Sequence, residues 1–234
     1  MSIAQNVDEV HQRIAAAARR VGRDPREIKL MGVSKTFAPE LIRETYAAGI
    51  QVFGENRVQE FSGKAPLLAD LKGVEWHMIG HLQTNKAAKA VELFNAIDSV
   101  DSLRLAEKLN GSAKLLDKKL QVLIEVNVGG EEAKSGILPD SHPLEDLLQA
   151  APYLDHLQYV GLMTIPPFYD DPENARPHFR KLRELRDHIL ARKLPDLRMD
   201  VLSMGMSHDF EIAIEEGATC VRIGTAIFGV RAKG

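Results

Sequence analysis

The stretch LQVLIEVNV, residues 120–128, is the clearest strand candidate of the chain. Apolar side chains fill almost every position, whereas a strand with one face in water alternates apolar and polar residues. The pattern is typical of a strand that other elements cover on both faces. Parallel sheets with helical crossovers bury their strands in this way.

Seven further apolar runs predict strands over residues 28–34, 51–56, 74–80, 95–100, 157–165, 199–205 and 219–224. Helix patterns lie between them: Pro39 to Gly49, a segment through Glu60 that Pro66 interrupts, about 85–94, from Asp101 or Ser102 onward, and about 144–151, 174–192 and 208–217. A loop over 129–142 follows the central strand.

Strands that alternate with helices run parallel in a sheet with helical crossovers. Eight such units in 234 residues predict a (β/α)8 TIM-type barrel, which we expect to form one domain over residues 1–234. An open doubly wound sheet is the alternative, but the first turn lacks its glycine fingerprint. A stripe at Val7, Val10, Ile14, Ala17 and Val21, ended by Gly22, predicts an extra helix before the first strand.

Composition narrows the function classes. The net charge of −3 gives no basic field, so nucleic-acid binding has no support. No run approaches 18 apolar residues, and the charged N-terminus lacks a secretory apolar region, so we expect no membrane span and a cytoplasmic location. The single cysteine, Cys220, lies in an apolar run and fits a buried residue in a reducing compartment.

In a barrel of this type, the site is built at the carboxyl ends of the strands. The polar residues that close the apolar runs are Lys35, Asn56, the segment 81–83, Asp98, Asn127, Thr164, the segment 203–207 and the segment 222–225. Strand ends also meet loops, which alone accounts for about half of these polar residues in our judgement. The remainder predict a polar ring at one end of the barrel.

The last two strand ends indicate a phosphate site. Ser207 precedes a helix and fits a helix cap, but a helix N-terminus also binds phosphate. Gly224 permits close backbone approach, and Thr225 offers a hydroxyl group. In barrels the loops after strands seven and eight often hold phosphate. We therefore expect a ligand that carries a phosphate group.

Two cationic residues have two interpretations each. Lys35 either reaches solvent at its strand end or is an amine that forms a Schiff base, which requires a desolvated setting. Lys134, in a loop, is a rival amine. Arg222 either points outward to a helix carboxylate or points inward to a phosphate or a ring nitrogen. His77 and His81 have no convincing third ligand, so we expect no metal site.

The chain resembles the pyridoxal-phosphate homeostasis protein family. The resemblance rests on GVSKT, FGENRVQE, WHMIGHLQTNK, SVDS, VNVGGEEAKSG, GLMTIPP, LSMGMSHDFEIAIEEGAT and VRIGTAIFG, in the family's order from Gly32 to Gly229. Members are similar to the N-terminal barrel of alanine racemase, without the racemase's C-terminal β domain.

The resemblance implies that Lys35 carries pyridoxal 5′-phosphate (PLP) as a covalent aldimine. It implies that the phosphate lies among small and hydroxylated residues, that Arg222 faces the pyridine nitrogen, and that Asn56 lies near the ring. The phosphate residues are Ser203, Gly205, Ser207, Gly224 and Thr225. Pro39 stands where the racemase has a tyrosine.

The family role is PLP (vitamin B6) homeostasis without established catalytic turnover, which implies PLP-dependent apo-enzymes as recipients of the cofactor. We expect a monomer. One alternative is a PLP enzyme acting on amino acids, as a racemase or lyase. Another is a cofactor-free Schiff-base enzyme acting on sugar phosphates.

Overall fold

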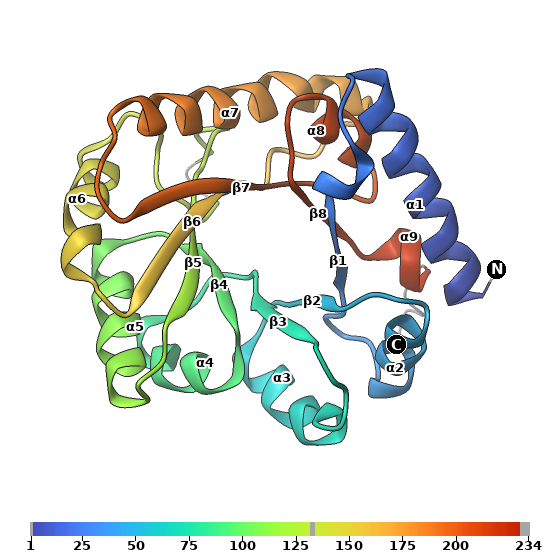
Figure 1. Ribbon diagram of the computed structural model, residues 1–234, viewed down its shortest axis with the longest axis horizontal. Coiled ribbons are helices and arrows are strands. Elements are labelled where there is room, and N and C mark those ends of the chain that lie inside the picture. Colours follow the sequence, from blue (N-terminus) through green and yellow to red (C-terminus); the bar gives the residue numbers. More distant parts are fainter. Residues whose placement is uncertain (1, 132–133, 230–234) are drawn as a thin grey trace.

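A closed barrel forms the centre of the molecule. The computed structural model describes residues 2–131 and 134–229; residues 1, 132–133 and 230–234 lie outside it. Within the described ranges, eight parallel strands pair in sequence order, and the last pairs with the first (Figure 1). They are β1 Lys29–Val33, β2 Val52–Glu55, β3 Glu75–Met78, β4 Ala96–Val100, β5 Leu120–Glu125, β6 Leu157–Met163, β7 Leu197–Met206 and β8 Cys220–Ile223.

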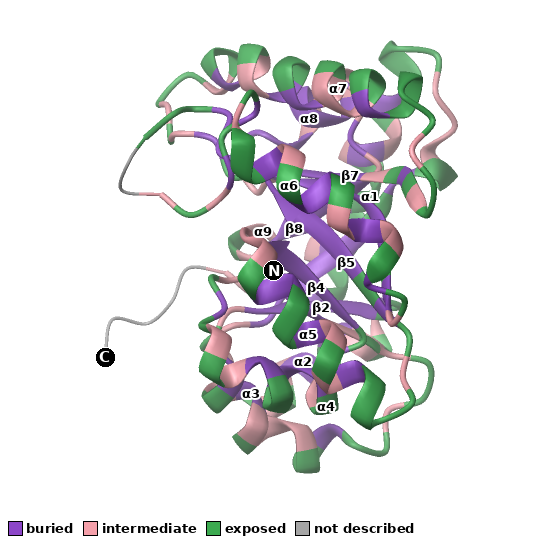
Figure 2. Ribbon diagram, turned by 90° about the vertical axis from the view of Figure 1, so that its left-hand side faces the viewer, coloured by how far each residue is buried: buried purple, intermediate pink, exposed green. Residues whose placement is uncertain are grey.

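Helices surround the barrel (Figure 1). They are α1 Ile3–Arg20, α2 Pro39–Ala47, α3 Val58–Lys64, α4 Ala87–Leu93, α5 Leu103–Leu115, α6 His142–Ala150, α7 Arg176–Ala191, α8 Phe210–Glu215 and α9 Thr225–Phe228. Figure 2 shows buried residues along the strands and exposed ones on the outer faces of the helices. The predicted barrel is confirmed, and the open sheet is excluded.

Helix α1 is the predicted extra helix. Ser2 caps it, because its hydroxyl accepts the Gln5 N–H while the Gln5 side chain accepts the Ser2 N–H. The stripe from Val7 to Ala17 is buried, but Val21 is 42% exposed because the helix ends at Arg20. The prediction that the helical stripe extends to Val21 is therefore wrong.

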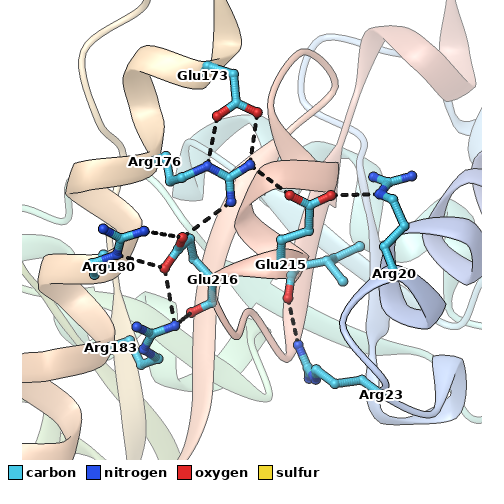
Figure 3. A network of polar contacts seen from close by, with 9 residues as sticks. Arg20, Arg23, Glu173, Arg176, Arg180, Arg183, Glu215 and Glu216 are labelled. Atoms are coloured by element: carbon cyan, nitrogen blue, oxygen red, sulfur yellow. Dashed lines mark hydrogen bonds and ion pairs between the residues drawn. The ribbon is translucent and has the colours of Figure 1, made fainter.

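An ion-pair network fastens α1 and α7 to α8 (Figure 3). The side chain of Glu216 is only 6% exposed, and its carboxylate oxygens form ion pairs with three guanidinium groups at N–O distances of 2.9–3.2 Å. These belong to Arg176, Arg180 and Arg183. Neighbouring Glu215 bridges Arg20 and Arg176 at 2.7 Å each. A shared, largely buried carboxylate is costly to leave without partners, so the network fixes the helix that follows β7.

The helix boundaries differ from the predictions mainly at their ends. The predicted helix over 208–217 is shorter, because Asp209 is the N-cap of α8. Short 3₁₀ turns precede α4 and α7, over Thr84–Lys86 and Pro172–Ala175. The four-residue helix α9 follows β8 and was not predicted, since one turn has too few residues to show a period. Within the described ranges, no helix has the length and apolar character needed to cross a membrane.

Candidate functional site

A cavity of about 330 Å³ opens at the carboxyl ends of the strands. Most of the polar residues predicted at strand ends line it: Lys35, Asn56, His81, Ser207, Arg222, Gly224 and Thr225. Glu125, Ser135, Met206 and several apolar residues complete the lining. A larger hollow of about 480 Å³ is lined by Lys119, Leu157 and Leu197, at the opposite ends of the strands, away from this polar ring.

Lys35 enters the cavity from the end of β1, which stops at Val33. The next residue, Thr36, has a φ of +67°, a conformation that is unusual for a β-branched side chain. Beyond it, the Phe37 ring stacks on Phe228 with centroids 4.5 Å apart and forms part of the cavity wall. A sharp backbone turn therefore separates the lysine from α2.

Arg222 is 3% exposed and lines the cavity, so its side chain points inward from β8. Its guanidinium donates to the carbonyl and hydroxyl oxygens of Ser203 and to the carbonyl of Thr164, all at 2.7 Å. Within the described residues it has no carboxylate partner within ion-pair distance. Burial lowers the pKa of the guanidinium, but an arginine stays charged at any physiological pH. The cavity therefore contains a fixed positive charge held by neutral oxygens.

The end of β7 supplies a serine hydroxyl to the cavity. Ser207 Oγ accepts the backbone N–H groups of Gly224 and Ala226, both at 3.3 Å, and so joins β7 to the start of α9. The cap of α8 is Asp209, so the interpretation of Ser207 as its cap is wrong. A hydroxyl has one donor and two acceptor sites, so these contacts leave its O–H for a ligand.

Ser203 and Gly205 lie beneath the cavity rather than in its lining. Ser203 is fully buried and holds Arg222. Gly205 has a φ of +92°, and a Cβ there would lie 2.6 Å from Ala213 Cβ and 2.8 Å from Phe210 Cα. The glycine lets α8 pack closely against the strand that carries Ser207.

Asn56 follows β2 and lines the cavity beside the backbone of Gly80. A Cβ on Gly80 would lie 2.5 Å from the Asn56 carbonyl oxygen, so only glycine permits this approach. His81 pairs through Nδ1 with Asp101 at 3.0 Å, on the same side of the cavity.

Glu125, at the end of β5, was missed by the strand-end prediction because the apolar run continues past it. It is 6% exposed, and within the described residues its Oε2 has no hydrogen-bond partner. Burial and the charge of Asp101 raise the pKa of the Glu125 carboxyl to about 7, against the opposing charges of Arg222 and His81. The cavity thus contains a carboxyl group that titrates near neutrality.

Other predicted strand-end residues have structural roles. The Thr164 hydroxyl donates to the Val126 carbonyl, and Asn127 holds the loop through Gly130 and Glu131. Asp98 is not at a strand end, because β4 continues to Val100. That prediction is wrong.

Asp98 instead forms a buried pair with His77 inside the barrel, with 3.0 Å between its Oδ1 and the His77 Nδ1. Burial opposes protonation of His77, but Asp98, aided by Glu75, raises the pKa of the imidazole to about 9. No group of three or more metal-ligating side chains occurs in residues 2–131 or 134–229.

Sequence reasoning also missed a buried ion-pair network beside Lys35. Glu55, at the end of β2, is fully buried and accepts the Ser34 hydroxyl at 2.7 Å and the Lys64 ammonium at 3.2 Å. These residues come from two strands and a helix, so no local sequence pattern links them. The rival amine, Lys134, forms an ion pair with Glu131 at 3.0 Å, and the cavity lining does not include it.

A closed parallel barrel with a lysine, a fixed arginine and hydroxyl groups at its carboxyl end defines a class of barrel proteins that bind small anionic ligands. Residues 5–232 match the family model described as alanine racemase, N-terminal domain. A relative from Aquifex aeolicus, named pyridoxal phosphate homeostasis protein, is 48% identical over 231 residues, which are 99% of each chain.

The solved structure of PipY from Synechococcus elongatus PCC7942 with PLP bound superposes with a TM-score of 0.81 at 37% identity, over 97% of this chain and all of PipY. Alanine racemase from Clostridium difficile 630 has a TM-score of 0.76 at 16% identity, over 99% of this chain and 57% of the racemase, and shares the fold. The chain belongs to the pyridoxal phosphate homeostasis protein family.

Proposed function

We propose that the protein holds PLP as an aldimine on Lys35 and acts in intracellular PLP homeostasis and supply, rather than in catalytic turnover. One observation carries the proposal: a single cavity combines Lys35, Arg222, Ser207, Gly224 and Thr225. PipY, which aligns with 97% of this chain over its whole length, has been solved with PLP bound.

The chemistry of the cavity wall fits a phosphate group near β7 and β8. The Ser207 O–H is available to donate, because the Ser207 oxygen accepts the N–H groups of Gly224 and Ala226. Thr225 adds a second hydroxyl. Ser203 and Gly205 support this wall from beneath, through Arg222 and through the contact with α8.

Arg222 and Asn56 fit the ring. Arg222 would face the pyridine nitrogen, where its permanent positive charge would disfavour a proton on that nitrogen. Asn56 makes no side-chain hydrogen bond to another described residue, so its amide remains for the ring substituents. Without ring protonation the cofactor is a weaker electron sink, which favours holding over turnover.

Lys35 supplies the covalent link. Its neutral amine would add to the aldehyde carbon of PLP; a C–N double bond would replace the C–O double bond, and the oxygen would leave as water with the two hydrogens of the amine. The reverse reaction with water releases the cofactor unchanged. Reversible binding of this kind needs no oxidant and no second substrate.

An absorption spectrum of purified protein with added PLP tests the proposal. The wild type should show an imine band in the visible or near-ultraviolet range that borohydride abolishes. Lys35→Ala should lack the band, whereas Lys134→Ala should keep it. A band that survives Lys35→Ala would reject Lys35 as the attachment site, and no band in any variant would favour the cofactor-free alternative.

Glu125 favours a second candidate, a PLP enzyme that acts on amino acids. A carboxyl group with a pKa of about 7 suits proton transfer at neutral pH. The test is exchange of the α-proton in deuterated water for a panel of amino acids. Steady exchange that Glu125→Gln abolishes would support an enzyme, and no exchange above that of free PLP supports a carrier.

The carrier role implies delivery to PLP-dependent apo-enzymes, and we propose that the protein acts as a monomer. Transfer is measured by mixing the loaded protein with an apo-enzyme and a scavenger of free PLP. Activation that outpaces release of PLP to the scavenger supports direct delivery. Activation limited by that release contradicts it.

A further inference from the structure

The backbone on both sides of Lys35 is held by the ion-pair network of Lys64, Glu55 and Glu60. On the preceding side, the Lys64 ammonium donates to the Ser34 carbonyl at 3.1 Å. On the following side, Glu60 Oε1 accepts the Thr36 N–H at 2.5 Å. Lys64 and Glu60 are joined to each other at 2.6 Å, so one pair of side chains spans the lysine.

The network is anchored in the barrel. Glu55 is fully buried at the end of β2 and accepts from Lys64 at 3.2 Å. The same carboxylate accepts the Ser34 hydroxyl at 2.7 Å. Lys64 is itself largely buried, with 11% of its side chain exposed. An ammonium has three N–H donors, and Ser34, Glu55 and Glu60 account for all three.

The network also stabilises an unfavourable backbone conformation. Thr36 has a φ of +67°, which is unfavourable for a residue with a Cβ atom. The Glu60 carboxylate accepts the Thr36 N–H within this turn, so their hydrogen bond helps to hold the turn in place. We expect that loss of this hydrogen bond lets the turn after Lys35 relax toward ordinary φ values, which would change the direction of the lysine side chain.

We infer that Lys64, Glu55 and Glu60 are positioning residues for the amine of Lys35, none of which lines the cavity. The inference rests on the proposed attachment of PLP to Lys35. It assigns a function to a charged cluster whose burial would otherwise serve only stability. A Schiff-base amine must approach the aldehyde carbon along a narrow range of directions, so misplacement slows attack.

The test is the rate of imine formation after rapid mixing with PLP, followed by absorbance. Lys64→Met and Glu60→Ala should slow it roughly ten- to hundredfold, as expected when a reacting group is misplaced. Glu60→Gln keeps an acceptor oxygen for the Thr36 N–H and should restore most of the rate. Lys89→Met is the matched control, because it removes an exposed ion pair to Glu92, also at 2.6 Å.

Two further measurements separate the outcomes. Thermal unfolding identifies variants that fail to fold. The pH dependence of the imine band reports the surroundings of the Lys35 amine, and a change in the stability of the fold alone would not shift it. Unchanged rates and pH profiles in folded Lys64→Met and Glu60→Ala would overturn the inference. Absence of any imine in the wild type would instead overturn the proposed function.

Discussion

Gly205 lets α8 pack against β7, close to Ser207 of the proposed phosphate site. Its substitution by alanine therefore tests both the packing of the fold and the phosphate site. A Cβ at this position would lie 2.6 Å from Ala213 Cβ and 2.8 Å from the Phe210 Cα, well inside van der Waals contact. The φ of +92° adds backbone strain. Strain contributes about 1–2 kcal/mol and overpacking about 1–3 kcal/mol, so we expect a loss of roughly 2–5 kcal/mol in the free energy of unfolding.

Gly63→Ala is the matched control. Gly63 is exposed in α3, and no atom lies within 4 Å of an added Cβ. The same chemical change there should stabilise the protein by about 0.5–1 kcal/mol, because alanine favours the helix.

Denaturant unfolding measures both variants, and thermal unfolding should show a fall of roughly 4–20 °C for Gly205→Ala. Because Ser207 lies two residues further along the chain, retention of PLP should fall as well. Equal stability of Gly205→Ala and wild type would refute the packing argument. If Gly205→Ala is as stable as the wild type but loses PLP, the substitution affects the phosphate site and not the stability of the fold.

Three further predictions concern the cavity and the barrel interior. Ser207→Ala combined with Thr225→Ala should weaken PLP retention, measured by dialysis, roughly a hundred- to ten-thousandfold, since each of the two hydrogen bonds to a charged group contributes about 1.5–3 kcal/mol. The Glu125 carboxyl has a pKa raised from 4.5 to about 7, so its contribution to the stability of the fold is complete below pH 4.5 and is lost as the pH rises to 7. Glu125→Gln should remove this pH dependence of the free energy of unfolding, which amounts to about 3 kcal/mol. The pKa of His77 is raised from 6.5 to about 9, so its pairing with Asp98 stabilises the fold fully below pH 6.5, and this contribution is lost as the pH rises through 9. His77→Gln should remove this pH dependence of the free energy of unfolding between pH 6.5 and 9.

Controls make these outcomes decisive. Ser112→Ala removes a half-buried serine whose hydroxyl, within the described residues, donates only to the Lys108 carbonyl of its own helix, and the change should leave PLP retention unchanged. A loss as large as that of the double variant would contradict the phosphate assignment. If Glu125→Gln and His77→Gln keep the wild-type pH dependence of stability, the two pKa shifts do not act on folding.

The barrel was predictable because its signal repeats. Eight apolar runs alternate with helices, so errors of a few residues at each end leave the topology unchanged. The same logic located Lys35, Arg222 and the residues around Thr225, because carboxyl ends of parallel strands converge. Asp98 failed because the run 95–100 does not show where within it the strand ends.

Contacts between distant residues could not be predicted. The position of Lys64 beside Ser34 depends on how α3 packs over β1 and β2, which no local pattern records. Glu125 was missed for a different reason: one carboxylate within an apolar run resembles a strand residue facing outward. Only the structure shows that Glu125 is buried and that, within the described residues, its Oε2 has no hydrogen-bond partner.

Peptide mapping of the borohydride-reduced protein tests the central claim most directly. Reduction of the complex with PLP makes the C–N bond permanent, and mass spectrometry then locates the modified lysine. We expect one modified site, Lys35, at close to one equivalent, and no modification in Lys35→Ala. A main adduct on Lys134 or another lysine, or no adduct in the wild type, would contradict it.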